Sequence, residues 1–590
     1  MLRNFCKFGR THRKHSPARV AEIQSLEPRT LPAGTVNIVV TTNGDVTVTG
    51  DNNDVAVDVT ANQVSVTGNE RTKVKFNGQV FRAGETVVID EFDDATLLGS
   101  LNVDMKDGDD NIKVALDSVM LEIARNLTVN LGDGDDSLRV ESLGETKLTV
   151  NGDVKLLGGD GADAIIVLGS ITSPEIVLNK TLTVDLGAGV DLFGLGRDHA
   201  LSEGLGFPDD SEFPDADPVF FDFGIFTGDG IGNFTVKGDV KILGGEGVDA
   251  IGLSNGGNVM FQKNLEITTG ADADFLEWQL GSEVSVTVLG DAKIETQDDS
   301  DLIFLKFGGS QTFGQSVHFA KSLTVNTGTG EDLVSIKLAD LTVNGEAKIN
   351  TGVGYDGILV QNFGQASFRK SLDINAGTGH ALVNLQSSGP ESSLFVAGDL
   401  KITTEALSDY VFVGDVLVEI DGELKIDTGI GSDFVGIEFG SNESFLEEGL
   451  VSYVGKDLKI DTGNGSDEVS IDVLSETRLK AKLDIKTGTQ SDFVSLDAEA
   501  DLTIDKDVNI DSGNHSDKVV FRAGEGNVLI EGTLNITLGN EDDGLLLGDK
   551  GGFAEGFSVL GDIKVAAGAG DDVISVESVT TEPRPHRRWR

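Results

Sequence analysis

One five-residue motif, GxGxD, recurs along nearly the whole chain of 590 residues. Strict copies end at Asp136, Asp163, Asp191, Asp249, Asp332, Asp356, Asp433, Asp467 and Asp572. Looser copies keep the aspartate at Asp110, Asp274, Asp301, Asp409, Asp492, Asp517 and Asp543, and one copy, GTGHA, has Ala381 in that place. Successive positions are mostly 24 to 29 residues apart. A fixed period of this length predicts a repeat architecture built from stacked structural units.

Each repeat unit has the same internal order of strands and turns, which is clear in residues 338–360, LADLTVNGEAKINTGVGYDGILV. A short strand over 341–343 meets an Asn-Gly turn, a second strand covers 347–350, and a third strand begins at Asp356 after the glycine turn. Apolar and polar residues alternate in these segments, and no segment long enough for a helix has a 3.6-residue apolar period. The pattern therefore predicts three short strands in each unit.

One such unit is too small to bury its own apolar side chains, so it must stack on its neighbours. Stacking places Leu458 and Ile460 beneath Leu483 and Ile485. We therefore expect an all-β fold, a parallel β-helix (solenoid) of about 18 to 20 coils, with three short strands per coil of about 25 residues. At a strand spacing of ~4.8 Å, the stack is a rod of about 90 Å around a column of Val, Ile and Leu side chains.

The repeat pattern divides the chain into three parts. Residues 1–34 are a basic leader, residues 35–580 are the β-helix, and residues 581–590 are a basic tail that ends in RPHRRWR. The repeat lapses at about 194–236, where residues 197–223 contain prolines and a cluster of acidic side chains. This insertion permits two interpretations, a functional loop such as a lid or binding site and a tolerated surface loop.

Charge limits the partners that such a chain can have. It contains 98 acidic and 46 basic residues, with a formal net charge of −52, and a single cysteine, Cys6. An acidic surface of this kind repels nucleic acid and anionic membranes and attracts cations or basic partners. We therefore expect no nucleic-acid partner. No stretch approaches the ~20 apolar residues of a membrane-spanning helix, so we also expect no transmembrane segment. Because there is no disulfide framework, packing or bound ions must hold the fold together.

The aspartate at the corner of each coil also permits two interpretations. In GSDEVSI, Asp467 has the same strand parity as Val469 and Ile471, so it turns inward if they do. Its carboxylate could accept backbone N–H bonds within its own glycine turn. Alternatively, carboxylates of successive coils and turn carbonyls could bind Ca²⁺, which takes roughly six to eight oxygen ligands. Two carboxylates one strand apart repel each other by ~3–4 kcal/mol at an effective dielectric of about 20, which favours the cation.

Two segments resemble a known calcium-binding repeat. Residues 158–166, GGDGADAII, and residues 244–252, GGEGVDAIG, are similar to the nonapeptide GGxGxDxUx of the hemolysin-type (RTX) β-roll proteins, which are typically secreted. The resemblance implies that Asp163 and Asp249 are Ca²⁺ ligands, and by extension that the same role falls to Asp136, Asp191, Asp332, Asp356, Asp433, Asp467 and Asp572. That family repeats its motif every nine residues along two calcium-lined edges. This chain has one such turn per coil, so the resemblance implies one calcium-lined edge on a β-helix.

A second resemblance lies in the leader. Residues 25–34, SLEPRTLPAG, follow a basic stretch and are similar to the LEPRxLL motif near the N-termini of exported or surface proteins of planctomycete bacteria, with Pro32 in place of the second leucine. The resemblance implies an extracellular or cell-surface location.

Two sets of outward-facing residues are predicted beside the corners. Lysines recur on the second strand at Lys155, Lys241, Lys293, Lys348, Lys401, Lys425, Lys459 and Lys564, which indicates a solvated face. Apolar residues recur just after the aspartate, at Leu192, Phe275, Leu302, Leu333, Tyr410, Phe434, Phe493 and Val573. If exposed, this apolar stripe would mark a contact with a protein or a sugar, whereas packing over the turns would bury it.

These observations favour a non-enzymatic, calcium-binding repeat protein of the cell surface or extracellular matrix, structural or adhesin-like. Its expected partners are calcium ions, with a surface polysaccharide or another envelope protein as a candidate. The alternative is a polysaccharide-binding or polysaccharide-degrading β-helix, a lyase or hydrolase. Against catalysis, the carboxylates form uniform ladders, whereas a working acid and base need unequal environments.

Overall fold

The structure is a computed structural model that describes residues 34–50, 54–59, 63–89, 97–116, 120–142, 147–168, 175–195, 233–255, 257–281, 284–307, 314–362, 364–387, 392–440, 451–549, 556–577 and 579–581. The leader, the insertion and the basic tail predicted from the sequence lie almost wholly outside these residues. Every regular element within them is a β-strand.

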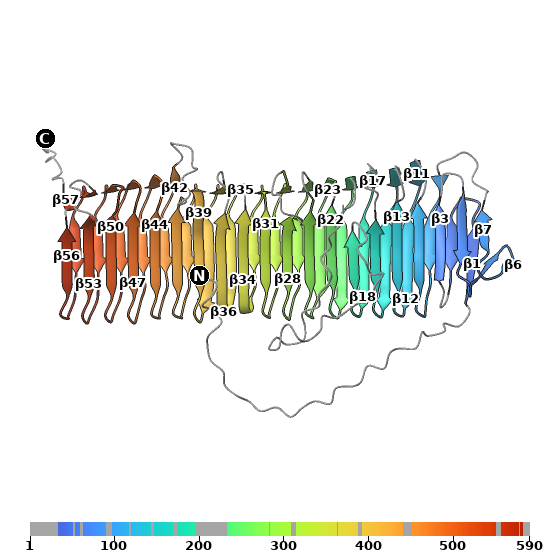
Figure 1. The fold of residues 1–590 in the computed structure, drawn as a ribbon, viewed down its shortest axis with the longest axis horizontal. Helices are drawn as coiled ribbons and strands as arrows, with labels where there is room; N and C mark the ends of the chain where they lie inside the picture. The colour runs from blue at the N-terminus through green and yellow to red at the C-terminus, as the bar shows by residue number, and fades with distance from the viewer. Residues whose placement is uncertain are drawn as a thin grey trace, which may run out of the picture.

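Three strands form each coil, and each strand pairs in parallel with the same strand of the next coil. In one coil, β42 (Ser452–Val454), β43 (Leu458–Asp461) and β44 (Glu468–Val473) pair with β45 (Thr477–Leu479), β46 (Leu483–Lys486) and β47 (Phe493–Ala498) of the next. Leu458 lies opposite Leu483 and Ile460 opposite Ile485, as the stacking argument expected. The predicted fold class, an all-β parallel β-helix with three short strands per coil, is confirmed (Figure 1).

The same pairing runs the length of the rod in three rows. The first strands are β8 (Leu97–Leu98), β11 (Met120–Ile123), β14 (Lys147–Val150), β17 (Glu175–Leu178), β20 (Asn233–Val236), β23 (Val259–Phe261), β26 (Ser285–Val288), β29 (Ser316–Phe319), β32 (Asp340–Val343), β35 (Gln365–Phe368), β37 (Ser393–Val396), the end of β39 (Tyr410–Ile420), β42, β45, β48 (Leu502–Ile504), β51 (Val528–Ile530), β54 (Phe557–Val559) and β57 (Val579–Thr581).

The second strands are β2 (Val46–Thr49), β9 (Leu101–Asp104), β12 (Leu127–Asp133), β15 (Val154–Asp160), β18 (Leu182–Ala188), β21 (Val240–Glu246), β24 (Leu265–Gly270), β27 (Ala292–Glu295), β30 (Leu323–Asn326), β33 (Ala347–Asn350), the start of β36 (Leu372–Ser387), β38 (Leu400–Ala406), β40 (Leu424–Asp427), β43, β46, β49 (Val508–Asp511), β52 (Leu534–Thr537) and β55 (Ile563–Ala566).

The third strands are β3 (Asp54–Val59), β10 (Asn111–Leu116), β13 (Ser137–Ser142), β16 (Ala164–Leu168), β19 (Leu192–Leu195), β22 (Ala250–Asn255), β25 (Phe275–Leu280), β28 (Leu302–Phe307), β31 (Leu333–Leu338), β34 (Val353–Asn362), the end of β36, the start of β39, β41 (Phe434–Phe439), β44, β47, β50 (Lys518–Ala523), β53 (Gly544–Asp549) and β56 (Val573–Glu577).

The core is one continuous column of inward-facing side chains, mostly Val, Ile and Leu. It forms because alternate residues of each strand point inward, and the register brings like residues over one another. A few aromatic rings fill wider levels, such as Trp278, which stacks on Phe319 with ring centroids 6.5 Å apart. Each coil therefore depends on its two neighbours for burial, as in other solenoids.

The N-terminal end has a cap that the repeat pattern did not indicate. Strand β1 (Thr35–Val40) pairs antiparallel with β2, β3 pairs antiparallel with β4 (Val64–Gly68), and β4 with β7 (Thr86–Ile89). Strand β5 (Lys73–Phe76) pairs with β1 and with the short β6 (Gln79–Val80). The antiparallel strands cover the first coils, which would otherwise present an open sheet edge and an apolar end. The β-helix predicted from residue 35 thus begins with a capping subdomain.

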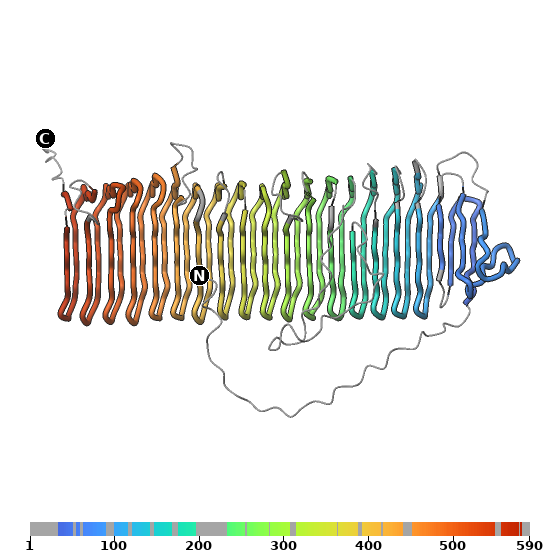
Figure 2. The backbone as a smooth tube through the Cα atoms, viewed as in Figure 1, coloured from blue at the N-terminus to red at the C-terminus, as the bar shows by residue number. Residues whose placement is uncertain are grey.

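At the C-terminal end, the last coil leaves core positions exposed. Ile574 and Val576 are 46% and 55% exposed, whereas Leu545 and Leu547, which occupy the same positions one coil earlier, are 2% and 0% exposed. In Figure 2, the two ends differ accordingly, with folded-back loops at the blue end and a bare coil at the red end.

Candidate functional site: a ladder of corner aspartates

The GxGxD turns join each second strand to the third strand that follows it. The first strands lie along the upper edge of the rod in Figure 1, so these turns line the opposite, lower edge, which Figure 2 shows as a row of superimposed corners. The glycines permit the close stacking, because the first glycine of the turn has a positive φ, as at Gly463 (φ 80°), and lies against the backbone of the coil before.

Hydrogen bonds tie the corner aspartates into a ladder along this edge. The backbone N–H of each corner residue donates to Oδ1 of the aspartate in the following coil, over 2.6–3.1 Å. Acceptors in this ladder are Asp136, Asp163, Asp191, Asp274, Asp301, Asp332, Asp356, Asp409, Asp433, Asp467, Asp492, Asp517, Asp543 and Asp572. The expected alignment of the corner carboxylates along one edge is therefore confirmed.

The donor to Oδ1 differs from the one in the first interpretation of the sequence, which placed it in the same glycine turn. A carboxylate that accepted N–H groups of its own glycine turn would stabilise one corner locally. Instead, Asp467 accepts the Asp433 N–H, 34 residues away and one coil earlier. This happens because the inward turn of the side chain points it along the rod axis toward the preceding coil. Each aspartate thus joins two coils.

The site residues proposed from the sequence fall at one structural position, and so do others. Asp136, Asp163, Asp191, Asp249, Asp332, Asp356, Asp433 and Asp467 are all 0–3% exposed, while Asp572, in the last coil, is half-buried. The aspartates of the looser copies are buried in the same ladder, with exposures of 0–4%: Asp110, Asp274, Asp301, Asp409, Asp492, Asp517 and Asp543. The strict and looser copies of the motif differ in their glycines, although their aspartates are structurally equivalent.

The ladder is interrupted in two places. Asp249 follows the long insertion after Asp191, and neither of its carboxylate oxygens has a hydrogen-bond partner among the described residues. At the other interruption, Ala381 has no carboxylate that could accept the backbone N–H of Asp356. There, β34 and β36 remain paired through the corner, with Asp356 opposite Ala381. Continuous strand pairing replaces the side-chain link at that coil.

The second carboxylate oxygen, Oδ2, is buried without a partner in most coils. Within the described part of the chain, this is true of Asp136, Asp163, Asp191, Asp249, Asp274, Asp301, Asp356, Asp409, Asp492, Asp517 and Asp543. A buried carboxylate oxygen without a donor destabilises the charged form, which must then be protonated or neutralised by a cation.

The pKa values of these carboxyl groups reflect that environment. Burial raises the pKa of Asp163 to about 7, and the charges of Asp136 and Asp191 add to the rise. Burial raises the pKa of Asp249 to about 9, with contributions from the charges of Asp274 and Asp191. Burial likewise raises the pKa of Asp301 to about 8. Near neutral pH, a proton therefore competes with any cation for the ladder.

Hydroxyl groups supply the missing donor in some coils. Thr327, Thr428 and Thr462, each five residues before the corner aspartate, donate to Oδ2 of Asp332, Asp433 and Asp467 over 2.6–2.7 Å. All three threonines are fully buried beside the corner carboxylate.

Two further corner ladders escaped the sequence analysis. At the corner before the second strand, Asn126 accepts the Asp153 N–H at 3.0 Å, and Asp399 accepts the Glu423 N–H at 2.9 Å. At the corner before the first strand, Asn258 accepts the Ser285 N–H at 3.0 Å. The sequence pattern that could have revealed them is the recurring Asn, Asp or Ser just before these strands. Their side chains are more exposed than the GxGxD aspartates, so the GxGxD corner alone buries its carboxylates.

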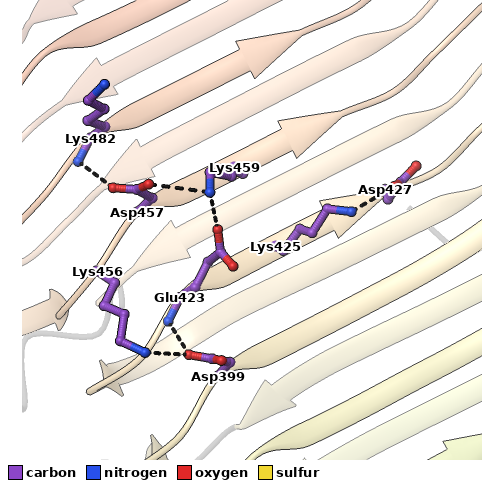
Figure 3. Close-up of polar contacts among 8 residues, drawn as sticks. All are labelled: Asp399, Glu423, Lys425, Asp427, Lys456, Asp457, Lys459 and Lys482. Atoms are coloured by element: carbon purple, nitrogen blue, oxygen red, sulfur yellow. Dashed lines mark hydrogen bonds and ion pairs between the residues drawn. The ribbon is translucent and has the colours of Figure 1, made fainter.

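The outward face of the second strands is solvated and cross-linked by ion pairs, as its lysine column indicated. Figure 3 shows Lys459 between Glu423 of the preceding coil and Asp457 of its own, the latter at 3.3 Å. Lys456 reaches Asp399 at 3.1 Å. Alternating charges of this kind relieve repulsion between stacked coils.

We expect Lys459→Met to lower the free energy of unfolding by less than about 1 kcal/mol, because the ion pairs are half-exposed and solvent screens them. Lys425→Met is the matched control, since the Lys425 ammonium meets Asp427 of its own strand at 3.0 Å. Urea unfolding at low and high salt measures both variants. A loss at Lys459 that persists in 1 M salt would contradict this account.

The predicted apolar stripe is largely packed on itself. Tyr410 and Phe434 stack with ring centroids 4.9 Å apart, and Phe275 lies 5.8 Å from Phe304. Most members are half-buried, and Val573, at the bare end of the rod, is 68% exposed. Neither of the two interpretations holds for the whole stripe, because neighbouring rings cover one another and leave their outer edges in solvent.

The corner offers oxygen atoms to a hard cation in the two coils that resemble the calcium-binding nonapeptide. A Cβ atom built on Gly158 would lie 2.6 Å from Oδ2 of Asp163 and 2.1 Å from the Leu186 carbonyl oxygen. At Gly244, the corresponding distances are 2.1 Å to Oδ2 of Asp249 and 2.3 Å to the Thr269 carbonyl oxygen. Carboxylate and carbonyl oxygens are the ligands that Ca²⁺ prefers. Within the described residues, no group of three or more His, Cys, Asp or Glu could hold a metal, so carbonyl oxygens would have to complete the shell.

A scan against protein-family models and searches of curated proteins and solved structures found no match to the chain. The part of the chain that the structure describes contains no helix long and apolar enough to cross a membrane.

Proposed function

We propose that this chain is a non-enzymatic structural rod of the cell surface or extracellular matrix, adhesin-like in role, whose GxGxD edge binds Ca²⁺. The observation that carries the proposal is the row of buried Oδ2 atoms without donors on aligned carboxylates. Burying charge without a partner is unfavourable, and a divalent cation shared between coils removes both the charge and the repulsion.

The rod form supports a structural role. A stack with one continuous core is stiff along its axis, and each coil adds only about 4.8 Å of length. The surface location rests on the leader segment SLEPRTLPAG, whose residues 25–33 lie outside the described part of the chain. Calcium fits that location, because extracellular modules typically bind it with Kd values of roughly 10⁻⁴ to 10⁻³ M.

The test is a calcium titration of the full chain. We expect millimolar Ca²⁺ to raise the melting temperature and a chelator to lower it, since binding to the folded state alone adds roughly 0.4 to 1.4 kcal/mol per site at one to ten times Kd. Asp163→Asn and Asp249→Asn should reduce this response, because asparagine keeps an acceptor oxygen but loses the charge. Differential scanning calorimetry measures the shift.

Asp399→Asn is the matched control for these variants. Asp399 also accepts a backbone N–H from the next coil, but its side chain is 50% exposed on another edge. It should leave the calcium response unchanged. A melting temperature that is the same in Ca²⁺ and in chelator would refute calcium binding, whatever the variants do.

A second candidate function, polysaccharide binding, is favoured by one observation. The half-buried rings of Phe275, Tyr410, Phe434 and Phe493 line one outward row of the third strands. Aromatic rings offer flat apolar faces and edges to sugars. Affinity electrophoresis in gels containing acidic or neutral polysaccharides should retard the chain, and Phe434→Ala should abolish the retardation. Mobility that no polysaccharide changes would exclude this candidate, and release of oligosaccharides would point to an enzyme instead.

A further inference from the structure

The residue five positions before the corner aspartate divides the ladder into two kinds of coil. It is a hydroxyl residue in one contiguous stretch, at Thr269, Thr296, Thr327, Thr351, Thr404, Thr428, Thr462, Thr487 and Ser512, interrupted once by Ala376. On the N-terminal side of this stretch, the same position holds Met105, Leu131, Gly158, Leu186 and Gly244, and on the C-terminal side it holds Leu538 and Ala567. The coils at the two sides therefore lack a hydroxyl beside their corner carboxylates.

Where the hydroxyl bond is well formed, it links the carboxylate to the next coil as well. The Thr428 hydroxyl lies 2.7 Å from Oδ2 of Asp433 and 3.4 Å from the Thr462 carbonyl oxygen. The Thr327 hydroxyl has the same two neighbours, at 2.6 Å from Oδ2 of Asp332 and 3.3 Å from the Thr351 carbonyl oxygen. The hydroxyl thus lies between two oxygen atoms that would otherwise face each other across a buried space.

Within this stretch, the interruption at Ala376 coincides with the loss of the corner carboxylate. Ala381, five residues later, is the one corner in the ladder without a carboxyl group. Both alanines are buried, at 2% and 5% exposure. Within this stretch, the hydroxyl is therefore absent only in the coil where no carboxylate needs it.

In the coils of Asp136, Asp163, Asp191 and Asp249, the same oxygen atoms have no hydroxyl between them. Oδ2 of each is buried without a partner. Oδ2 of Asp356 and Asp409 is also without a partner although a threonine precedes each, so the contrast is with the coils of Asp332, Asp433 and Asp467. At Gly158 and Gly244, the missing side chain leaves Oδ2 and the carbonyl oxygen of the next coil both facing the bare Cα. These are the coils with the strict nonapeptide sequence.

We infer that the threonine hydroxyls replace a bound cation in the coils of Asp332, Asp433 and Asp467, so that Ca²⁺ is needed by the coils of Asp136 to Asp249 and not by these three. This inference rests on the proposed calcium binding and specifies where along the rod it occurs. The chain then contains hydroxyl-stabilised coils in its centre and a calcium-stabilised N-terminal section, the coils from β12 to β22 in Figure 1. Calcium would govern the order of that section without being required by the hydroxyl-stabilised coils.

The test exchanges a hydroxyl for a methyl group at constant volume. Leu186→Thr adds a hydroxyl five residues before Asp191, and Leu186→Val creates the same loss of volume without one. We expect Leu186→Thr to have a smaller rise in melting temperature with Ca²⁺ than Leu186→Val, and to bind fewer Ca²⁺ ions in isothermal titration calorimetry. Conversely, Thr428→Val should gain a larger calcium response than the parent chain, and Thr428→Ser should not.

The outcomes separate the two proposals. A parent chain that responds to Ca²⁺, with equal responses in the Leu186→Thr and Leu186→Val variants, would overturn this inference and leave calcium binding intact. A parent chain that does not respond would overturn calcium binding, and this inference with it. The melting temperatures in chelator show whether the new hydroxyl bond forms, because Leu186→Thr then melts above Leu186→Val.

Discussion

Raising the pH from 5.5 to 8 in the presence of a chelator will destabilise this protein. The corner carboxyl groups have pKa values raised by burial, to about 6 at Asp136, about 7 at Asp163 and about 8 at Asp301, against an ordinary value of 3.8. The folded state therefore holds protons that the unfolded state has already released, and this stabilisation is lost as the pH rises through the folded pKa values. One pKa unit corresponds to about 1.4 kcal/mol, so the ladder as a whole can lose several kcal/mol.

Scanning calorimetry at pH 5.5, 7 and 8 measures this effect as a falling melting temperature. Asp163→Asn and Asp249→Asn should flatten the pH dependence, because asparagine has no carboxyl proton to release, and at position 163 it can still accept the Asp136 N–H. Carboxyl groups whose pKa is lowered, such as Asp291 and Asp399, act in the opposite direction, but only below about pH 4. Millimolar Ca²⁺ should reduce the dependence, since cations and protons compete for the same oxygens. A melting temperature that rises from pH 5.5 to 8 in chelator would contradict the raised pKa values.

Gly463→Ala will lower the free energy of unfolding much more than Gly544→Ala, a glycine substitution later in the rod. Gly463 has φ 80°, and a Cβ atom there would lie 1.7 Å from the carbonyl oxygen of Gly429 in the preceding coil. The left-handed backbone costs an alanine roughly 1–2 kcal/mol. The collision with a backbone atom adds to this cost, because the coils would have to separate and break the corner hydrogen bond from Asp433 to Asp467. We expect a total loss of about 3 kcal/mol or more.

Gly544→Ala is the matched control for that substitution. Gly544 opens strand β53 without a positive φ, and a Cβ atom there would meet Lys518 Cγ at 3.7 Å, an ordinary contact. This alanine should change the stability by less than about 1 kcal/mol, in the stabilising direction, because it restricts the unfolded chain. Both variants are compared by denaturant unfolding followed by circular dichroism. Equal stability of the two would show that the coils can separate at the corner without loss.

The candidate site was only partly predictable from the sequence. The parity of Asp467 with Val469 and Ile471 correctly placed the carboxylate inward, because alternation along a strand is a local property. The Oδ1 partner was not predicted: one of the two interpretations placed it in the carboxylate's own turn, whereas the observed bond between Asp467 and Asp433 depends on how two coils are offset. The looser copies at Asp274 and Asp492 were undervalued, because the corner can form without both glycines. Calcium binding itself stays a prediction.

The N-terminal cap shows a different limit. Residues 35–89 alternate apolar and polar side chains as the later coils do, so the pattern predicted more of the same strands. Alternation is the same in parallel and antiparallel strands, and the choice between them depends on which partner covers the end of the rod.

By itself, the sequence determined the period, the three strands of each coil, the inward column and the edge along which the aspartates lie. It could do so because a solenoid coil touches only its neighbours, so that a repeating sequence becomes a repeating position in space. The tertiary structure alone decided the contacts between coils: the N–H that each Oδ1 accepts, the burial of Oδ2, the threonine that reaches it and the strands that cap the end. These depend on the offset and close approach of separate turns of the chain, which no single repeat unit contains.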